Sequence, residues 1–376
     1  MTEPAVPAPA AATAPDGLAA EERRARAHVT LLAWYAVEGR AHLPWRHTRD
    51  PYAILVSEVM LQQTQVERVL PKYEEFLARF PTLAALAAAP TGEVIRAWSP
   101  LGYNVRAVRL QAIAQQAVAR PDGALPDSLE GLLALKGIGR YTAGAVACFA
   151  FGLPVATVDT NIRRVLWRVF RGIEPARWPA GEAAARAALA LAEWALPPDR
   201  AYDWQQALMD HGATICLSRR PACERCPLSA VCAAYAETAR ETLFPSGEAL
   251  ARLREERAAH AAEPPPDGQH SAQVAERRAG YGVGTPRGGG RRAKQQIPFT
   301  STTRYFRGRI LDALRALPAG ESLALAALGP RIKPDFTAEE LPWLRALMAG
   351  LARDGLARLV DVKEGAGGDE ERVALP

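Results

Sequence analysis

Long apolar runs are missing from this chain of 376 residues. No stretch approaches the ~20 consecutive apolar residues that a membrane-spanning helix needs, so we expect a soluble, cytoplasmic protein that binds no membrane. Stretches in which apolar and polar residues alternate are also scarce, which argues against a mainly β architecture. Cysteine is limited to five residues, and we see no secretory segment before them, so disulfide bonds are not expected.

Composition sets broad limits on size and partners. Hydrophobic residues make up 49% of the chain, which is enough for a sizeable core. A length of 376 residues predicts two domains, or one domain with appendages. The formal net charge of +5 at pH 7 favours a nucleic-acid partner, but only weakly by itself.

Changes in composition divide the chain into four parts. Residues 1–20 are rich in alanine and proline and are predicted to be disordered. Residues 21–245 alternate apolar helical patterns with proline and glycine, which predicts an all-α core. Charge runs over 246–296 predict a flexible basic linker. Helical periodicity returns over 297–376 and ends in two strand-like pieces, LARLVDV and ERVALP, which indicates a small winged-helix-like α+β module.

Four of the cysteines form the most informative pattern, C-x6-C-x2-C-x5-C. Thiolates at such short spacings can converge on one metal centre through a tight local loop. Zinc and a [4Fe–4S] cluster both accept four thiolates, so the spacing leaves the metal open. The fifth, Cys148, lies in apolar AGAVACFAFGL and is expected to be a buried hydrophobic residue. The candidate ligands are Cys216, Cys223, Cys226 and Cys232.

A glycine turn joins two helix-like segments in LLALKGIGRYTAGAVA, residues 132–147. Gly137 and Gly139 lack Cβ atoms, so the turn can adopt positive φ and let backbone N–H groups approach a phosphate. An ordinary turn between two helices explains the same pattern. Arg140 and an Ala/Gly-rich helix start follow the turn, and Asp159 lies about twenty residues further on.

The hairpin, Asp159 and the cysteine loop together resemble the helix-hairpin-helix DNA glycosylases that carry a [4Fe–4S] cluster. Three segments narrow the resemblance to the adenine DNA glycosylase (MutY) family: LPWR at 43–46, VSEVMLQQTQV at 56–66 and LGY at 101–103. The similarity covers roughly residues 28–236. It implies that the four cysteines hold a [4Fe–4S] cluster and not zinc.

The resemblance also implies two helical subdomains within the core. A six-helix subdomain is expected over about 45–155, and an iron–sulfur subdomain over 21–44 together with 156–236. Many family members end in a Nudix-like, β-rich domain that reads 8-oxoguanine. Residues 297–376 are too short and too helical for such a domain.

The implied activity is that of a monofunctional adenine DNA glycosylase of base excision repair. Such an enzyme hydrolyses the N-glycosidic bond of adenine mispaired with 8-oxoguanine or guanine in double-stranded DNA, after flipping the base out. We expect a monomer associated with the nucleoid. Two alternatives stay open: a mismatch thymine or uracil glycosylase of the same superfamily, and a non-catalytic iron–sulfur DNA-binding protein.

Glu58 is the candidate general acid. On a helix its neighbours at three and four residues include Ile54, Leu55 and Leu61, and lost hydration among aliphatic groups raises a carboxyl pKa. A glutamate that points to water is the alternative. In the family the matching glutamate protonates adenine at N7, so that the base can leave.

Asp159 is the candidate partner of the sugar cation. It precedes an amphipathic run, which predicts a helix N-cap. In the family the matching aspartate faces the anomeric carbon and stabilises or captures the cation. Thr160 stands where the more familiar pattern has glycine, and Asn161 keeps its place and is expected to orient the acid or a water.

Tyr141 separates two classes of enzyme. Bifunctional relatives carry a lysine directly after the hairpin, and its amine attacks the sugar. A phenol cannot form a Schiff base, so Tyr141 indicates base release without strand cleavage. Lys136, inside the hairpin, is expected to contact a phosphate.

Further contacts with base and DNA follow from the resemblance alone. Gln63 and Tyr103 match residues that enter the DNA stack beside the opposite purine; a surface glutamine and a core tyrosine are the alternatives. Asn104 stands where the family often has a second aromatic residue. Trp45, Arg46 and Leu61 are expected to line the adenine pocket. The full set is Trp45, Arg46, Leu61, Gln62, Gln63, Thr64, Tyr103, Lys136, Gly137, Gly139 and Arg140.

Basic residues gather before and within the C-terminal module. From Tyr281 to Leu311 there are seven of them and no acidic residue. A solvated linker face and a grip on DNA phosphates both explain this pattern, and we favour the grip over direct reading of a base. The residues are Arg287, Arg291, Arg292, Lys294, Arg304, Arg307 and Arg309.

Overall fold

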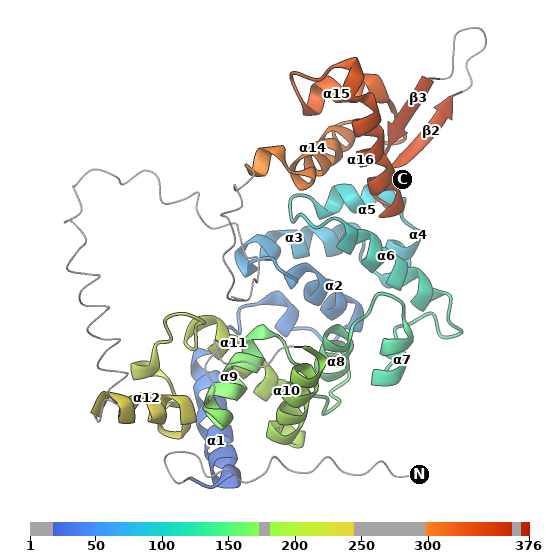
Figure 1. Cartoon of the computed structure of the whole chain (residues 1–376). Helices are drawn as coiled ribbons and strands as arrows, with labels where there is room; N and C mark the ends of the chain where they lie inside the picture. The colour runs from blue at the N-terminus through green and yellow to red at the C-terminus, as the bar shows by residue number, and fades with distance from the viewer. Residues whose placement is uncertain (1–17, 173–180, 244–297, 363–369) are drawn as a thin grey trace, which may run out of the picture.

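The described helices gather around three hydrophobic cores, and the last of these includes a small sheet (Figure 1). The computed structural model describes residues 18–172, 181–243, 298–362 and 370–376. Most of the predicted tail and the whole predicted linker lie outside these residues, as do Arg287, Arg291, Arg292 and Lys294. No helix in the described ranges is both long and apolar enough to cross a membrane.

Between residues 18 and 243 the described chain is mainly helical, which confirms the predicted all-α character of the core. Its α-helices are α1 (Ala20–Glu38), α2 (Pro51–Leu61), α3 (Val66–Arg79), α4 (Leu83–Ala88), α5 (Thr91–Trp98), α6 (Val105–Val118), α7 (Leu129–Ala134), α8 (Arg140–Phe149), α9 (Thr160–Arg171), α10 (Gly181–Ala195), α11 (Ala201–Thr214) and α12 (Ala233–Leu243). Short 3-10 helices are η1 (Pro44–Arg46), η3 (Pro198–Arg200), η4 (Cys223–Arg225) and η5 (Ser229–Val231).

The first core is formed mainly by α2 to α8, and local sequence explains where these helices begin. Asp50 caps α2 by accepting the Tyr52 N–H at 3.0 Å, and Pro51 fills the first helical position, where no N–H is needed. Thr82 and Ser128 cap two six-residue helices, α4 and α7. Residues 45–155, all described, therefore hold seven α-helices where six were expected, because each short segment has a capping hydroxyl.

The second core joins the start of the chain to residues far along it. Ala27 and Leu31 of α1 are fully buried, and α1 packs against α9 and α11. Val155 packs on the first core and Ala156 belongs to the second, so the chain crosses between cores at this point. Whether the two expected subdomains behave as separate units stays a prediction.

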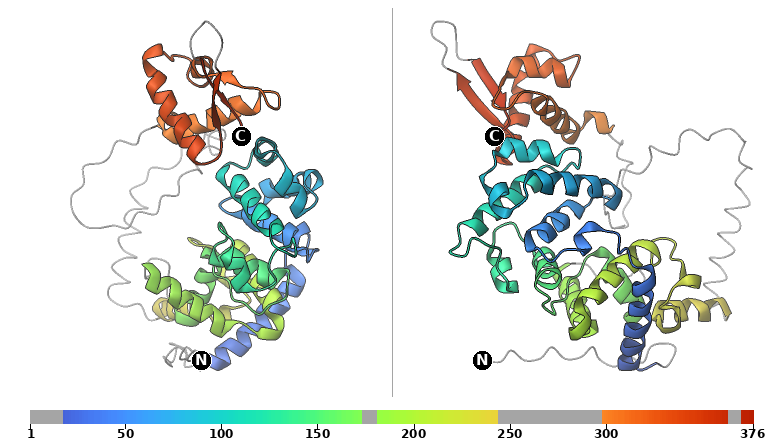
Figure 2. Two further views of the ribbon diagram at one scale, coloured as in Figure 1. Left: turned by 90° about the vertical axis from the view of Figure 1, so that its right-hand side faces the viewer. Right: turned by 180° about the vertical axis from the view of Figure 1, so that it is seen from behind.

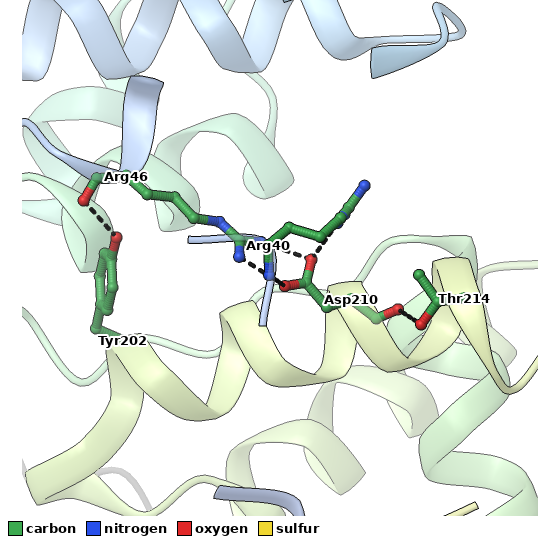
Figure 3. A network of polar contacts seen from close by, with 5 residues as sticks. All are labelled: Arg40, Arg46, Tyr202, Asp210 and Thr214. Carbon is green, nitrogen blue, oxygen red and sulfur yellow. Dashed lines mark hydrogen bonds and ion pairs between the residues drawn. The ribbon is translucent and has the colours of Figure 1, made fainter. Parts of the chain in front are cut away.

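A buried carboxylate ties the two cores together (Figure 3). Asp210 on α11 has no exposed surface, and its two oxygens accept hydrogen bonds at 2.6 Å from the Arg46 guanidinium. Arg40 adds its backbone N–H at 2.8 Å and its Nε at 2.6 Å. Burial alone would raise the pKa of Asp210, but these donors hold it below its usual value. The charged carboxylate thus fixes the segment between α1 and α2 onto α11.

In the described residues after 297, helices pack against a three-stranded antiparallel sheet. The strands stand in the order β1-β3-β2, so β3 pairs with both neighbours. Strand β2 lies in the first predicted piece, and β3 begins one residue before the second. Strand β1 has only two residues and shows no alternation in the sequence. The elements are η6 (Phe299–Ser301), α14 (Thr303–Arg315), β1 (Leu323–Ala324), α15 (Leu325–Ile332), η7 (Ala338–Glu340), α16 (Leu341–Arg353), β2 (Arg358–Val362) and β3 (Glu370–Ala374).

This C-terminal module is docked on α5, as both views in Figure 2 show. Ile95 of α5 is fully buried within the module's own apolar cluster. The Gly92 N–H donates to the Pro376 carbonyl at 2.9 Å, and a Cβ at Gly92 would meet that same oxygen at 2.9 Å. Arg96 donates to the Leu317 carbonyl at 3.0 Å, just beyond the end of α14. The module is therefore held against α5 by hydrogen bonds and apolar packing, in addition to its covalent connection along the chain.

We expect Asp210→Ala to lower the free energy of unfolding by about 3–5 kcal/mol, because it leaves the buried Arg46 charge without a partner. Equilibrium urea unfolding at pH 7 will measure this loss. Asp203→Ala on the same helix is the matched control, since Asp203 pairs with Arg200 at the surface and should contribute less than about 1 kcal/mol. Equal losses in the two variants would contradict the role given to Asp210.

Candidate active site

A cavity of about 1000 Å³ opens where the first two cores meet. Its walls come from the end of α2, the starts of α8 and α9, and one side of α10. These segments are far apart in sequence, so only the folded chain brings their polar side chains together. The sequence-predicted residues that line it are Glu58, Leu61, Gln62, Gln63, Thr64, Arg140, Tyr141, Asp159 and Asn161.

Glu58 is the buried acid of this cavity. It is 6% exposed on a helix that is buried along most of its length, so the alternative of a glutamate pointing to water is wrong. Burial is the main cause that raises the pKa of Glu58 to about 7, and the charge of Asp159 raises it further. A hydrogen bond with Tyr141 and the charge of Arg46 act in the opposite direction. The carboxyl can therefore hold a proton near neutral pH.

Asp159 caps α9, and the same side chain lines the cavity. Its Oδ1 accepts the Ile162 N–H at 2.6 Å, which confirms the predicted N-cap. Its Oδ2 accepts a hydrogen bond from the Asn161 side chain at 3.1 Å. Burial raises the pKa of Asp159, whereas these donors favour its charged form. Helix capping and Asn161 thus fix the direction of the carboxylate.

A chain of hydrogen bonds connects Asp159 to the cysteine loop. Asn161 donates to Asp159 and accepts from Arg164 Nη2 at 2.9 Å. Arg164 is buried; its Nε donates to the Cys216 carbonyl at 2.7 Å, and its Nη2 donates to the Gly212 carbonyl at 2.6 Å. A movement of the cysteine loop would therefore disturb the groups that hold the Asp159 carboxylate.

The four cysteines line a second cavity, of about 560 Å³. Arg168 Nη1 lies 3.4 Å from Cys216 Sγ, and His211 Nε2 lies 3.1 Å from Cys226 Sγ. Burial raises the pKa of Cys226 to about 12 and that of Cys232 to about 11, which favours the neutral thiols over the thiolates. Among the described side chains, no three of His, Cys, Asp or Glu form a group that could hold a metal ion. Four thiols around one cavity are nevertheless the donor set of a thiolate-bound cluster.

The glycine turn joins α7 to α8 and leaves helix N–H groups available. Gly137 has φ of +103°, and a Cβ there would lie 2.8 Å from Arg109 Cγ, so conformation and packing both require glycine. Gly139 precedes α8, and no side chain caps this helix. Gln116 fixes the turn by donating to the Lys136 carbonyl at 3.0 Å and accepting the Lys136 N–H at 2.9 Å. An uncapped helix start beside an exposed lysine suits a phosphate.

Two loops have an unusual backbone conformation. One lies at the cavity, between α2 and α3, and the other precedes α6. Among described non-glycine residues, positive φ occurs at Gln63, +56°, and Tyr103, +46°, a costly conformation that concentrates at functional sites. Buried Arg106 holds both loops by donating to the Gln62 carbonyl at 2.5 Å and the Gly102 carbonyl at 3.2 Å. Tyr103 is 43% exposed, so the alternative of a core tyrosine is wrong.

Trp45 and Arg46 lie outside the walls of the large cavity. The Trp45 ring is buried and packs edge-on against Tyr73, with centroids 5.4 Å apart. Arg46 is bonded to Asp210, although its charge still lowers the pKa of Glu58. Their expected contact with a base stays a prediction.

Several residues that form or support the site belong to no recognisable sequence motif. Ala188 and Leu189 of the alanine-rich α10 form one wall. Gln205 fixes the chain before Asp159 by accepting the Thr157 N–H at 2.6 Å. The sequence signal for Arg106 is an arginine on a mainly apolar face of α6, because a charge at such a position needs buried hydrogen-bond acceptors.

The chain is similar to known DNA repair proteins. Residues 56–182 match the HhH-GPD superfamily of base excision DNA repair proteins. The adenine DNA glycosylase of Mycolicibacterium smegmatis is 47% identical over 203 residues, which are 54% of this chain and 67% of that protein. The adenine DNA glycosylase of Mycobacterium tuberculosis is 39% identical over 290 residues, 76% of this chain and 77% of that protein. The structure of a thermostable thymine-DNA glycosylase is 32% identical with a TM-score of 0.52, covering 58% of this chain and 98% of that one.

Tyr141→Phe should raise the pKa of Glu58 above about 7, because it removes a hydrogen bond that favours the charged carboxylate. Titration of side-chain ¹³C signals in glutamate-labelled protein will measure the shift, with Glu58→Gln identifying the signal. Tyr73→Phe, at another buried tyrosine, is the control and should leave that pKa unchanged. A lowered pKa in Tyr141→Phe would show that the hydroxyl does not stabilise the carboxylate.

Proposed function

The chain belongs to the adenine DNA glycosylase family of the HhH-GPD superfamily, and we propose that it hydrolyses the N-glycosidic bond of adenine mispaired with 8-oxoguanine or guanine. It is a DNA glycosylase of base excision repair. One observation carries the proposed chemistry: Glu58, with a pKa of about 7, shares a cavity with Asp159. Two carboxyl groups in different environments are the arrangement that glycosidic cleavage uses.

Glu58 begins the proposed reaction as general acid. Its proton passes to N7 of a flipped adenine, and the N9–C1′ bond breaks with its electron pair left on the base. A pKa of about 7 suits this task, because about half of the carboxyl groups are protonated at pH 7 and the proton is still given up readily. Neutral adenine leaves, and the sugar becomes cationic at C1′.

Asp159 then stabilises the sugar cation. The Ile162 N–H and the Asn161 side chain already hold its carboxylate, so little reorganisation is needed during the reaction. Water adds to C1′, and the proton that it loses restores the acid form of Glu58. By analogy with glycosidases, the two carboxyl groups should lie about 5–9 Å apart.

Tyr141 makes the proposed enzyme monofunctional, because a phenol forms no Schiff base with the sugar. Burial is the main cause that raises the pKa of Tyr141 well above its usual range, so the hydroxyl stays neutral. Its hydrogen bond to Glu58 supports a role in setting the acidity of that carboxyl.

In this proposal DNA is bound by the hairpin and by the two loops in which Gln63 and Tyr103 have positive φ. The uncapped start of α8 and Lys136 contact a phosphate. Gln63 and Tyr103 enter the stack beside the opposite purine, and their preset backbone supports this role. Flipping the adenine costs a few kcal/mol, which these insertions help to offset.

The cysteine loop is proposed to hold a [4Fe–4S] cluster through Cys216, Cys223, Cys226 and Cys232. Their shared cavity, together with the approach of Arg168 to Cys216 Sγ, supports this assignment. When bound, the cluster supplies the positive centre that lets buried thiols ionise. Arg164 and Arg168, which bond to the loop backbone, would pass its position on to α9.

The C-terminal module is proposed to be a winged helix that assists DNA binding. Its order of helix, strand, helix, helix, strand and strand supports that fold. The two helical cores are proposed to act as the six-helix and iron–sulfur subdomains, because the candidate acid comes from one and Asp159 from the other.

Single-turnover base release from A:8-oxoG, A:G, T:G and U:G duplexes tests the proposed function. The enzyme should release adenine from the first two and no pyrimidine from the others. Glu58→Gln should slow adenine release by at least about 10²–10⁴-fold, since an amide has no carboxylic proton, while duplex binding is kept. Preferred release of thymine or uracil would favour the activity named for the thymine-DNA glycosylase of similar structure.

The same reactions carry two further tests of the mechanism. The reaction needs Glu58 protonated and Asp159 charged, so the rate should fall about tenfold per pH unit above pH ~7 and fall again at acid pH, where Asp159 takes up a proton. Borohydride added during turnover should trap no covalent protein–DNA adduct, because Tyr141 offers no amine. Efficient trapping would reveal a nucleophilic lysine elsewhere.

Protein purified without oxygen should contain about four iron and four sulfide ions per chain. Cys226→Ser should lose the iron and weaken the surrounding fold, because one ligand is missing. Cys148→Ala is the matched control, since this buried cysteine belongs to the first core and should leave the iron in place. Stoichiometric zinc without iron would overturn the assignment.

A further inference from the structure

A cleft of about 730 Å³ separates the Gly102–Val105 loop from the start of α14. Phe299 and Tyr103 are 62% and 43% exposed there, which is unusual for large aromatic side chains. Aromatic faces combined with arginines are a pattern that binds nucleotide chains. The aromatic and basic residues of the cleft are Tyr103, Phe299, Arg304, Tyr305, Arg307 and Arg309.

A hydrogen bond and a packing contact join the C-terminal module to the segment that carries Tyr103. Arg315, at the end of α14, donates to Asn104 Oδ1 at 2.5 Å. Asn104 therefore has a structural role, because its amide oxygen bonds the C-terminal module to the loop that carries Tyr103. Packing adds to this contact, because a Cβ at Gly355 would lie only 3.2 Å from Val108 Cγ1 on α6.

Arg304 differs from the other arginines of the cleft. Arg307 is ion-paired within the module, and Arg309 donates to a backbone carbonyl at 2.8 Å. The Arg304 guanidinium lies over the Tyr103 ring, 4.7 Å from its centroid, and has no hydrogen bond or ion pair with any part of the chain that the structure describes. Its N–H donors are therefore available to a ligand.

We propose that this cleft binds the sugar–phosphate backbone of the strand opposite the flipped adenine, with Arg304 donating to a phosphate while it stays stacked on Tyr103. A planar guanidinium can do both, because its face packs on a ring while its edge donates to phosphate oxygens. The inference rests on the proposed function, which puts Tyr103 beside the opposite purine. Arg304 is then a positioning residue, through which the C-terminal module sets the place of Tyr103.

Coupling between one side chain and one phosphate tests this proposal. Duplexes carry guanine opposite 2′-fluoro-2′-deoxyadenosine, which resists base loss, and a neutral methylphosphonate at one position of either strand. Dissociation constants are measured for the full chain and for Arg304→Ala. The protein without the substitution should bind about 10-fold more weakly when the methylphosphonate replaces one phosphate that flanks the opposite guanine. Arg304→Ala should bind about 10-fold more weakly throughout and show no further loss at that phosphate.

Salt dependence and two matched variants complete the test. The slope of log K against log salt should fall by about 0.9 in Arg304→Ala and be restored in Arg304→Lys, which keeps the charge. Arg345→Ala removes a module arginine that pairs with Glu371 at 2.6 Å, and should change neither quantity. Coupling at no phosphate of the opposite strand, or only on the adenine strand, would overturn the proposal. Failure of the proposed function shows differently, as no adenine release from an ordinary A:G duplex.

Discussion

The two carboxyl groups of the candidate site come from different hydrophobic cores, and the contact between Arg46 and Asp210 fixes one core on the other. Glu58 lies on α2, a few residues after the short 3-10 helix that ends at Arg46. Asp159 caps α9, and α9 packs against α11, the helix that carries Asp210. This ion pair, which helps to fix the cores that carry the two carboxyl groups, lies outside the cavity. The same Arg46 charge also lowers the pKa of Glu58, so one side chain both joins the cores and adjusts the acid.

Burial of Glu58 has a cost that the rest of α2 must offset. Folding raises the pKa of Glu58 to about 7, so the ionised carboxylate lowers the free energy of unfolding most at high pH. The penalty is absent below the unfolded pKa of about 4, grows as pH rises between the two values, and is complete above the folded one. The apolar residues that surround this position on α2 stabilise the helix by packing, which is why an ionisable group can persist inside it.

Sequence patterns predicted the local features well, because their causes are local. The helix around Glu58, the glycine turn and the N-cap at Asp159 each follow from residues within a few positions. Contacts between distant segments were not predictable in this way. The bond between Arg315 and Asn104, and the donors from Arg106 to two separate loops, join residues that no short pattern relates.

The C-terminal module shows the same division between local and distant causes. Its two longer strands were visible as apolar pieces, while β1 forms only because β3 offers it a partner. The motif containing Trp45 and Arg46 suggested a base pocket, and the fold places both side chains among protein neighbours. Motifs identify residues that a fold keeps, but the direction in which each side chain faces depends on tertiary packing.

One guanidinium, that of Arg106, anchors the backbone beside both Gln63 and Tyr103. These hydrogen bonds hold the two loops without DNA, so the insertion proposed for them would carry little conformational entropy cost. Resistance to insertion then resides in the duplex itself, in the stacking of the base steps that must open. An enzyme that inserted these loops as proposed would open weakly stacked pyrimidine–purine steps more readily than stiff A-tracts, so the mechanics of the DNA would set the order in which sites are inspected.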